Sequence, residues 1–182
     1  MPERNTLVRS MHDLGLGAWF GGSLMGAVGL NGAASHASDP RERLALSSRG
    51  WGMWAPVNAL AIGTHVIGSL GLLAGNKTRL MKQPEAQANT VVKAGLTVLA
   101  VGLTAYSGAL GAKVAKKAHE GDAAEGATEP GAQTSMKTTM AQKQLKAMQW
   151  AIPLVTGTLV VLGAQQGEQQ RPVAGWMRSM RR

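Results

Sequence analysis

Charged side chains are missing from four long stretches of this chain. No Asp, Glu, Lys or Arg occurs within residues 14–38, 50–76, 94–112 or 147–167. About 20 helical residues cross a hydrocarbon layer roughly 30 Å thick, so each stretch is long enough, or nearly so, to span a membrane. We therefore expect an all-α protein, an integral membrane four-helix bundle.

The predicted helices share one membrane domain spanning 1–182, and they cover about 14–34, 54–75, 91–112 and 148–164. The mean hydropathy of −0.04 is low for such a protein, because Gly, Ser and Thr dilute the apolar stretches. Trp51 and Trp54 open the second stretch and Trp150 opens the fourth, as expected of indole rings at a membrane interface. A soluble, Gly/Ala-rich helical protein is the alternative.

The N-terminus has some features of a signal peptide. Arg4 and Arg9 precede the first apolar stretch, and Ser35-His36-Ala37 resembles a cleavage site. The apolar stretch is longer than the hydrophobic region of a usual signal peptide. We therefore expect it to remain as the first membrane helix.

Basic residues do not orient the predicted helices. Four spans place the N-terminus, the second loop and the C-terminus on one side, with ten Lys and Arg against nine on the other. The positive-inside rule requires an imbalance. The short basic flanks of the first and last spans favour both termini inside.

A long polar loop, flexible and covering about 113–146, separates the third and fourth predicted helices. Residues 112–120 are helical in character and basic, and 121–134 contain Gly, Ala, Glu and Pro without a large apolar side chain. Such a segment buries too little surface to order itself alone. Residues 135–149 return to helical character, either as a basic helix resting on lipid headgroups or as an extension of the fourth helix.

Glycines recur at helical spacing within the apolar stretches. Three GxxxG pairs are present: Gly17 with Gly21, Gly22 with Gly26, and Gly71 with Gly75. Small residues allow helix backbones to approach closely in lipid, where apolar burial no longer drives association. These glycines are predicted to pack the bundle, or to pack it against another protein.

His65 is an ionisable residue near the middle of the second predicted helix. Such a residue inside a membrane is a candidate functional site, for a proton or for a ligand such as haem or a quinone. Asn58 lies two helical turns before it on the same face. We expect the two side chains to share a polar stripe that Thr97, Thr104 and Ser107 face. The plainer alternative is a neutral His65 satisfied by hydrogen bonds.

A haem with two axial histidines requires a second imidazole at the depth of His65. His12 and His36 flank the first predicted helix, each about 18 Å along the axis from its centre, and His119 lies in a loop. We therefore expect none of them to meet His65, and we expect no bis-histidine haem.

Several functional classes lack a signature in the sequence. Cysteine is absent, which excludes disulfides and thiolate metal sites. No phosphate-binding loop, HExxH or GxSxG motif occurs, so no catalytic residue, metal site or cofactor is predicted. The net charge of +9 comes from basic residues that flank the apolar stretches. This pattern favours membrane anchoring over nucleic-acid binding.

Residues 12–22 read HDLGLGAWFGG. This segment resembles the first helix of small four-helix membrane proteins of the copper-resistance-D type and their uncharacterised relatives. The resemblance implies a four-helix membrane protein, with His12 at the interface and Trp19 within a stretch that packs the bundle. It covers about eleven residues of 182, and the metal or haem ligands expected by analogy are not evident.

The sequence favours a multi-pass protein of a bacterial plasma membrane, since the glycine-rich composition fits a GC-rich bacterial genome. Its expected partners are the lipid bilayer and either a second copy or a larger membrane complex, in which it acts as a structural or accessory subunit without catalysis. Two alternatives remain: a small transporter or channel with a polar path around His65, and a haem- or quinone-binding protein.

Overall fold

The computed structural model describes residues 5–77 and 84–169. These residues form helices and connections, without a strand among them. The elements in chain order are α1 (Thr6–Met25), a π-helical turn η1 (Gly26–Leu30), α2 (Asn31–Ser35), α3 (Pro40–Gly75), α5 (Pro84–His119) and α6 (Met136–Gln169). The predicted all-α class is confirmed.

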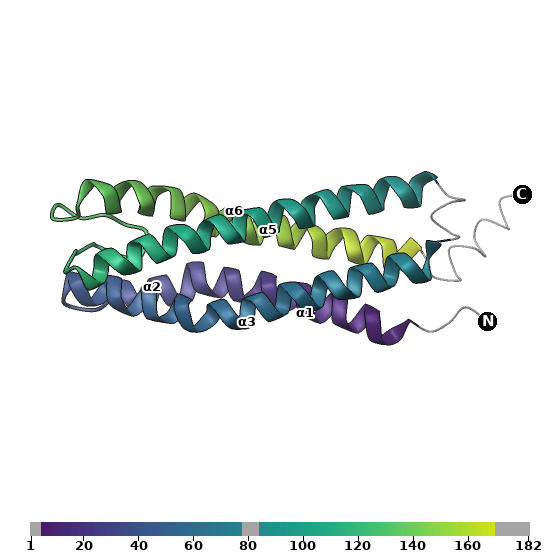
Figure 1. Ribbon diagram of the computed structural model, residues 1–182, viewed down its shortest axis with the longest axis horizontal. Coiled ribbons are helices and arrows are strands. Elements are labelled where there is room, and N and C mark those ends of the chain that lie inside the picture. The colour runs from purple at the N-terminus through teal and green to yellow at the C-terminus, as the bar shows by residue number, and fades with distance from the viewer. Residues whose placement is uncertain (1–4, 78–83, 170–182) are drawn as a thin grey trace, which may run out of the picture.

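Two antiparallel helical hairpins lie side by side (Figure 1). In the first, α1, η1 and α2 run along α3; in the second, α5 runs along α6. Smaller contacts of α1 with α6 and of α3 with α5 join the hairpins. The tight turn at 36–39 and the α5–α6 loop lie at one end, and the start of α1 and the end of α6 lie at the other (Figure 1).

The helices are longer than the predicted ones. In particular, α3 and α5 have 36 residues each and α6 has 34, whereas about 20 suffice for a membrane. Charged residues end an apolar stretch but not a helix, so the polar flanks continue the same helices. At the start of α3, Asp39 accepts a hydrogen bond from the Arg41 backbone N–H and Pro40 takes the first helical position.

The extent predicted for the flexible loop, 113–146, is wrong. Residues 113–119 belong to α5 and 136–146 to α6, so only 120–135 connect the helices. Within this loop Ala124 and Ala127 are buried. The loop is held by polar bonds to the helices rather than by large apolar side chains, a possibility that composition alone does not indicate.

The bundle is apolar outside and partly polar inside. Large apolar side chains stay exposed along its length, including Leu14, Leu60, Ile67, Val98, Leu154 and Val161, while Asn31, Asn58, His65, Gln149 and Thr156 are buried. Three helices of the described chain are long and apolar enough to cross a membrane: Pro40–Gly75, Gln87–His119 and Met136–Gln165. The N-terminal helix packs in the same bundle but is not among them.

Candidate functional site

His12 and His65 meet between α1 and α3. Their ring centroids are 4.4 Å apart, with the ring planes inclined by 46°. The prediction that His12 cannot reach His65 is therefore wrong. It placed His12 before the first helix, whereas α1 already begins at Thr6. The two histidines also stand at nearly equal distances along the chain from the turn at 36–39, so an antiparallel hairpin brings them together.

Gly15 and Gly68, which belong to none of the three GxxxG pairs, allow this approach. A Cβ built at Gly15 would lie 2.5 Å from the His65 backbone N, and one at Gly68 would lie 2.4 Å from the His12 backbone N. Neither position has room for a side chain, because the obstacle is backbone. The α1 and α3 backbones thus touch beside the histidine pair, as small residues permit in membrane bundles.

The hydrogen bonds of His65 determine its neutral tautomer. Its Nδ1 lies 3.0 Å from the His12 carbonyl O, and a carbonyl only accepts, so Nδ1 carries the proton and donates. In the neutral ring Nε2 is then a bare acceptor. The His65 side chain is almost fully buried (1% exposed), and Nε2 has no hydrogen-bond partner in the described chain. The alternative of a neutral His65 with all its hydrogen bonds made therefore holds for Nδ1 but not for Nε2.

The histidine pair does not fit a haem held between the two rings. Metal–imidazole bonds are about 2 Å long, so two axial nitrogens stand about 4 Å apart and the ring centroids farther still. The observed centroid separation of 4.4 Å leaves no room for a macrocycle. Among the described residues, no group of three or more His, Cys, Asp or Glu is placed to hold a metal ion.

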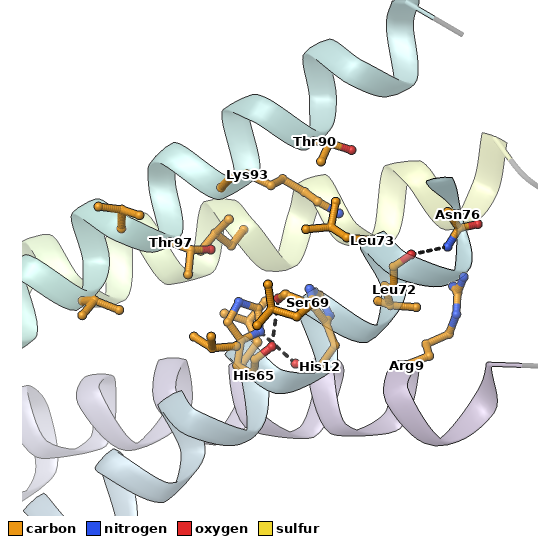
Figure 2. Close-up of a pocket in the computed structure, with 17 residues that line it drawn as sticks. Arg9, His12, His65, Ser69, Leu72, Leu73, Asn76, Thr90, Lys93 and Thr97 are labelled. Atoms are coloured by element: carbon orange, nitrogen blue, oxygen red, sulfur yellow. Dashed lines mark hydrogen bonds between the residues drawn. The ribbon is translucent and has the colours of Figure 1, made fainter. Parts of the chain in front are cut away.

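A cavity of about 400 Å³ opens beside His65, between α1, α3 and α5, and Leu159 of α6 also lines it. Most of its lining is apolar, and its polar side chains come from all three helices: Arg9, His12, His65, Ser69, Asn76, Thr90, Lys93 and Thr97. Figure 2 shows Lys93 and Arg9 extending toward the Leu72–Asn76 end of α3, away from His65. Lys93 and Arg9 were counted as membrane flanks in the sequence, and only the hairpin register reveals them as cavity residues.

Asn58 lines a different cavity. This second space, of about 450 Å³, lies mainly between α3 and α5 and also contains Thr104 and Ser107, whereas Thr97 lines the His65 cavity. Asn58 is buried and its Oδ1 has no hydrogen-bond partner in the described chain. The predicted stripe shared by Asn58 and His65 is thus divided between two cavities.

Trp19 contacts one lining residue of each cavity, His65 and Thr104. It is fully buried, its ring centroid lies 6.3 Å from that of His65, and its Nε1 donates to Thr104 Oγ1 over 3.1 Å. A large indole ring at this place fills the centre of the bundle. The cavities are therefore two sites rather than one continuous polar path.

The glycines predicted to pack helices fall into two groups. Four of them face neighbours within the first hairpin: Gly22 faces the Trp54 ring, Gly26 the Trp51 ring, Gly71 the Val8 side chain and Gly75 the Asn5 side chain. A Cβ at Gly17 or Gly21 would meet nothing within 4 Å. Both glycines have open space beside them, and Gly17 also lines a space of about 390 Å³ that α6 borders.

The cavity beside His65 combines a mostly apolar lining with two cationic side chains and an imidazole ring. The resemblance of residues 12–22 to the copper-resistance-D type stays a prediction. Comparison of the chain with known protein families, curated proteins and solved structures gives no match.

Proposed function

We propose that this protein is a multi-pass membrane protein of a bacterial plasma membrane that serves as a structural or accessory subunit. In this proposal the N-terminal helix spans the membrane together with α3, α5 and α6, since it is packed between the helices of both hairpins. The chain performs no catalysis. It joins a second copy or a larger membrane protein through its outer helix faces.

The inverted distribution of polar and apolar side chains carries this proposal. Buried polar groups bond to one another between helices: Asn31 Nδ2 donates to Gln149 Oε1 over 2.7 Å, and Trp51 Nε1 donates to Asn31 Oδ1 over 2.9 Å. At the same time Leu60, Val98 and Leu154 are largely exposed. Water disfavours such a surface over so large an area, whereas a hydrocarbon layer favours it.

Open glycine faces support the subunit role. On α1, Gly21 has no neighbour within 4 Å of a built Cβ, and the same holds for Gly95 and Gly102 on α5. An apolar helix face that lacks side-chain bulk lets a further helix approach closely in lipid.

The transporter alternative requires a polar path through the bundle. Asn58 and His65 line separate cavities, and Trp19 fills the space where they would join. This arrangement supports a packing or binding role over conduction.

Membrane fractionation followed by measurement of native mass tests the proposal. We expect the protein to resist carbonate extraction, to dissolve in mild detergent and to elute as an oligomer or with a copurifying membrane protein. Gly21→Leu and Gly102→Leu should reduce this assembly to a monomer. Gly63→Leu tests whether α3 also takes part in the assembly, because Gly63 on α3 also has open space at its Cβ. Release by carbonate, or a wild-type monomer without a copurifying protein, would contradict the proposal.

A further inference from the structure

The cavity between α3 and α5 is uncharged. Among the described residues that line it, none is Asp, Glu, Lys, Arg or His, and its polar side chains are those of Ser, Thr, Asn, Gln and Trp. An ionised group entering such a wall would lose its water without gaining a partner of opposite charge. The volume of about 450 Å³ lies in the range of small-molecule sites. The cavity therefore suits an uncharged molecule.

A chain of hydrogen bonds with a fixed direction ends at this cavity. It begins at Trp51 Nε1, and an indole N–H only donates, so the Asn31 atom that it contacts is the amide oxygen. Asn31 Nδ2 therefore donates to Gln149 Oε1. The amide orientation of Gln149 follows, and its Nε2 is a hydrogen-bond donor with no partner in the described chain.

The Gln149 donor is reachable from the cavity. Gln149 lines it, and the polar atoms that are both fully enclosed and without a partner include Trp54 Nε1 and Asn58 Oδ1 but not Gln149 Nε2. Because Gln149 as a whole is only 5% exposed, its free N–H faces an almost dry wall, where an unmade hydrogen bond costs free energy. A ligand atom that accepts a hydrogen bond, such as a carbonyl oxygen, removes that cost.

The wall favours a ring over a plain acyl chain. The indole rings of Trp51 and Trp54 both line the cavity, and each is seated on a glycine of α1, since a Cβ at Gly26 or Gly22 would collide with them. Aromatic rings pack favourably against such fixed rings. At roughly 30 Å³ for each water-sized group, the cavity holds about fifteen such groups, which is enough for one substituted ring.

The cavity opens toward the outside of the bundle between small residues. Gly52, Ala55 and Ala59 on α3 and Gly108 and Ala112 on α5 line it and are exposed. A gap bordered by such short side chains admits a flat molecule from the surrounding hydrocarbon.

We propose that the α3–α5 cavity binds an uncharged ring compound that carries carbonyl oxygens, of the quinone class, with one carbonyl oxygen accepting a hydrogen bond from Gln149 Nε2. This inference rests on the proposed membrane location, because the ligand enters from the bilayer. The ring lies beside the two indoles, and its alkyl tail leaves between α3 and α5. His65 takes no part, since it lines the other cavity.

Binding of defined amphiphiles to the detergent-purified full chain tests the proposal. The probe is decylubiquinone. Its comparisons are decylbenzene, which has a ring without a carbonyl oxygen, monodecanoin, which is an uncharged ester without an aromatic ring, and decanoic acid, which has an acidic head. Native mass spectrometry counts the bound molecules, and titration gives the Kd of each. We expect saturable binding of one decylubiquinone per chain and at least tenfold weaker binding of the other three.

Two pairs of variants locate the bound probe. Gln149→Glu keeps an oxygen for Asn31 and replaces the amide donor by a second oxygen, so at alkaline pH it should weaken decylubiquinone at least tenfold. Gln144→Glu makes the same change on α6 outside the cavity and should leave the Kd within twofold. Ala112→Trp should fill the mouth of the cavity. Ala109→Trp is its control, since both alanines are exposed on α5 and only Ala112 lines the cavity.

The outcomes separate this inference from the proposed function. Equal binding of any comparison compound, no binding of decylubiquinone, or binding that Ala112→Trp or Gln149→Glu leaves intact would overturn the cavity proposal. The Ala112→Trp result decides even where Gln149→Glu fails to fold. A carbonate-resistant protein that binds no decylubiquinone would refute only the ligand site, whereas release by carbonate would refute the membrane location itself.

Discussion

The two ends of the bundle differ in how their polar groups are used. At the loop end, formed by residues 39–50, 113–119, 120–135 and 136–146, polar side chains bond to the loop backbone and to one another. Gln142 Nε2, for example, donates to the carbonyls of Gly126 and Ala127 over 2.9 and 3.1 Å, although its Oε1 has no hydrogen-bond partner in the described chain. At the histidine end, formed by 5–16, 61–77 and 87–101, polar side chains line a cavity and His65 Nε2 has no partner in the described chain.

This difference bears on stability and on function. A polar group with its hydrogen bonds made contributes to the fold, whereas a cavity lined by polar side chains offers a binding site. The loop end therefore acts as a structural closure of the two hairpins. The histidine end and the cavity between α3 and α5 are the places to look for a ligand.

The largest effect is expected at the backbone contact of the histidine end. Gly68→Leu places a side chain where a Cβ would be 2.4 Å from the His12 backbone N. The helices must separate, and we expect a loss of about 3 kcal/mol in the free energy of unfolding. For a chain of this size that lowers Tm by roughly 6–12 °C. Thermal unfolding in detergent measures it.

The control for this substitution is Gly63→Leu. Gly63 lies on the same helix, and a Cβ there meets nothing within 4 Å, so its Tm should change by only a few degrees. In Gly68→Leu, hydrogen exchange should be faster in α1 and α3 near the histidines and unchanged at the loop end. Equal losses for the two variants would mean that the α1–α3 contact does not control stability.

The sequence predicted the helical class, the apolar cores of the helices and His65 as a buried ionisable residue, because these depend on local composition. It did not predict the His12–His65 contact or the role of Lys93, because these depend on hairpin register. The short connection at 36–39 holds the signal for that register: a tight turn aligns residues equidistant from it. Asn58 and His65 lie two turns apart on α3, but they line separate cavities formed with other helices, which spacing within α3 cannot reveal.

A second test concerns the buried network of Asn31, Trp51 and Gln149. Asn31→Leu removes two interhelical hydrogen bonds and leaves the indole N–H and the Gln149 amide without these partners. We expect a loss of about 1.5 kcal/mol in the free energy of unfolding. A double-mutant cycle with Gln149→Leu should give a coupling of roughly 0.6–1.7 kcal/mol. Additive losses would show that the 2.7 Å hydrogen bond between Asn31 and Gln149 contributes no coupling energy.

A third test concerns Asp122 at the loop end. Partial burial opposes ionisation of this carboxylate, but hydrogen bonds from Ser135 Oγ (2.6 Å) and Thr138 Oγ1 (2.5 Å) outweigh it and hold the pKa of Asp122 below its ordinary value of 3.8. A depressed pKa means that the folded state favours the charged form. Its contribution is therefore present above about pH 4 and is lost as the pH falls below that value.

Asp122→Asn should accordingly weaken the closure of the loop by about 1 kcal/mol near neutral pH. Hydrogen exchange of residues 120–135, corrected for intrinsic rates, should be faster in the variant at pH 6, and the difference from wild type should be smaller at pH 3. Glu129 supplies a smaller pH dependence in both proteins, since bonds from Thr128 and Lys146 outweigh its partial burial and lower its pKa. A difference between the proteins that persists unchanged at pH 3 would contradict the role of the carboxylate charge.

The smallest effect is expected for the ion pair between Arg43 Nη1 and Glu125 Oε2, whose atoms are 2.7 Å apart. The Glu125 side chain is 62% exposed, so Glu125→Gln should cost about 0.5 kcal/mol and the cost should disappear in about 1 M salt. Arg43→Gln should cost more and keep a salt-independent part, because Arg43 Nε also donates to the Ala37 carbonyl over 2.7 Å. If Glu125→Gln instead costs as much as Asn31→Leu, surface charge rather than the buried hydrogen bonds closes the loop end. The loop end would then open at high salt while the histidine end stays intact.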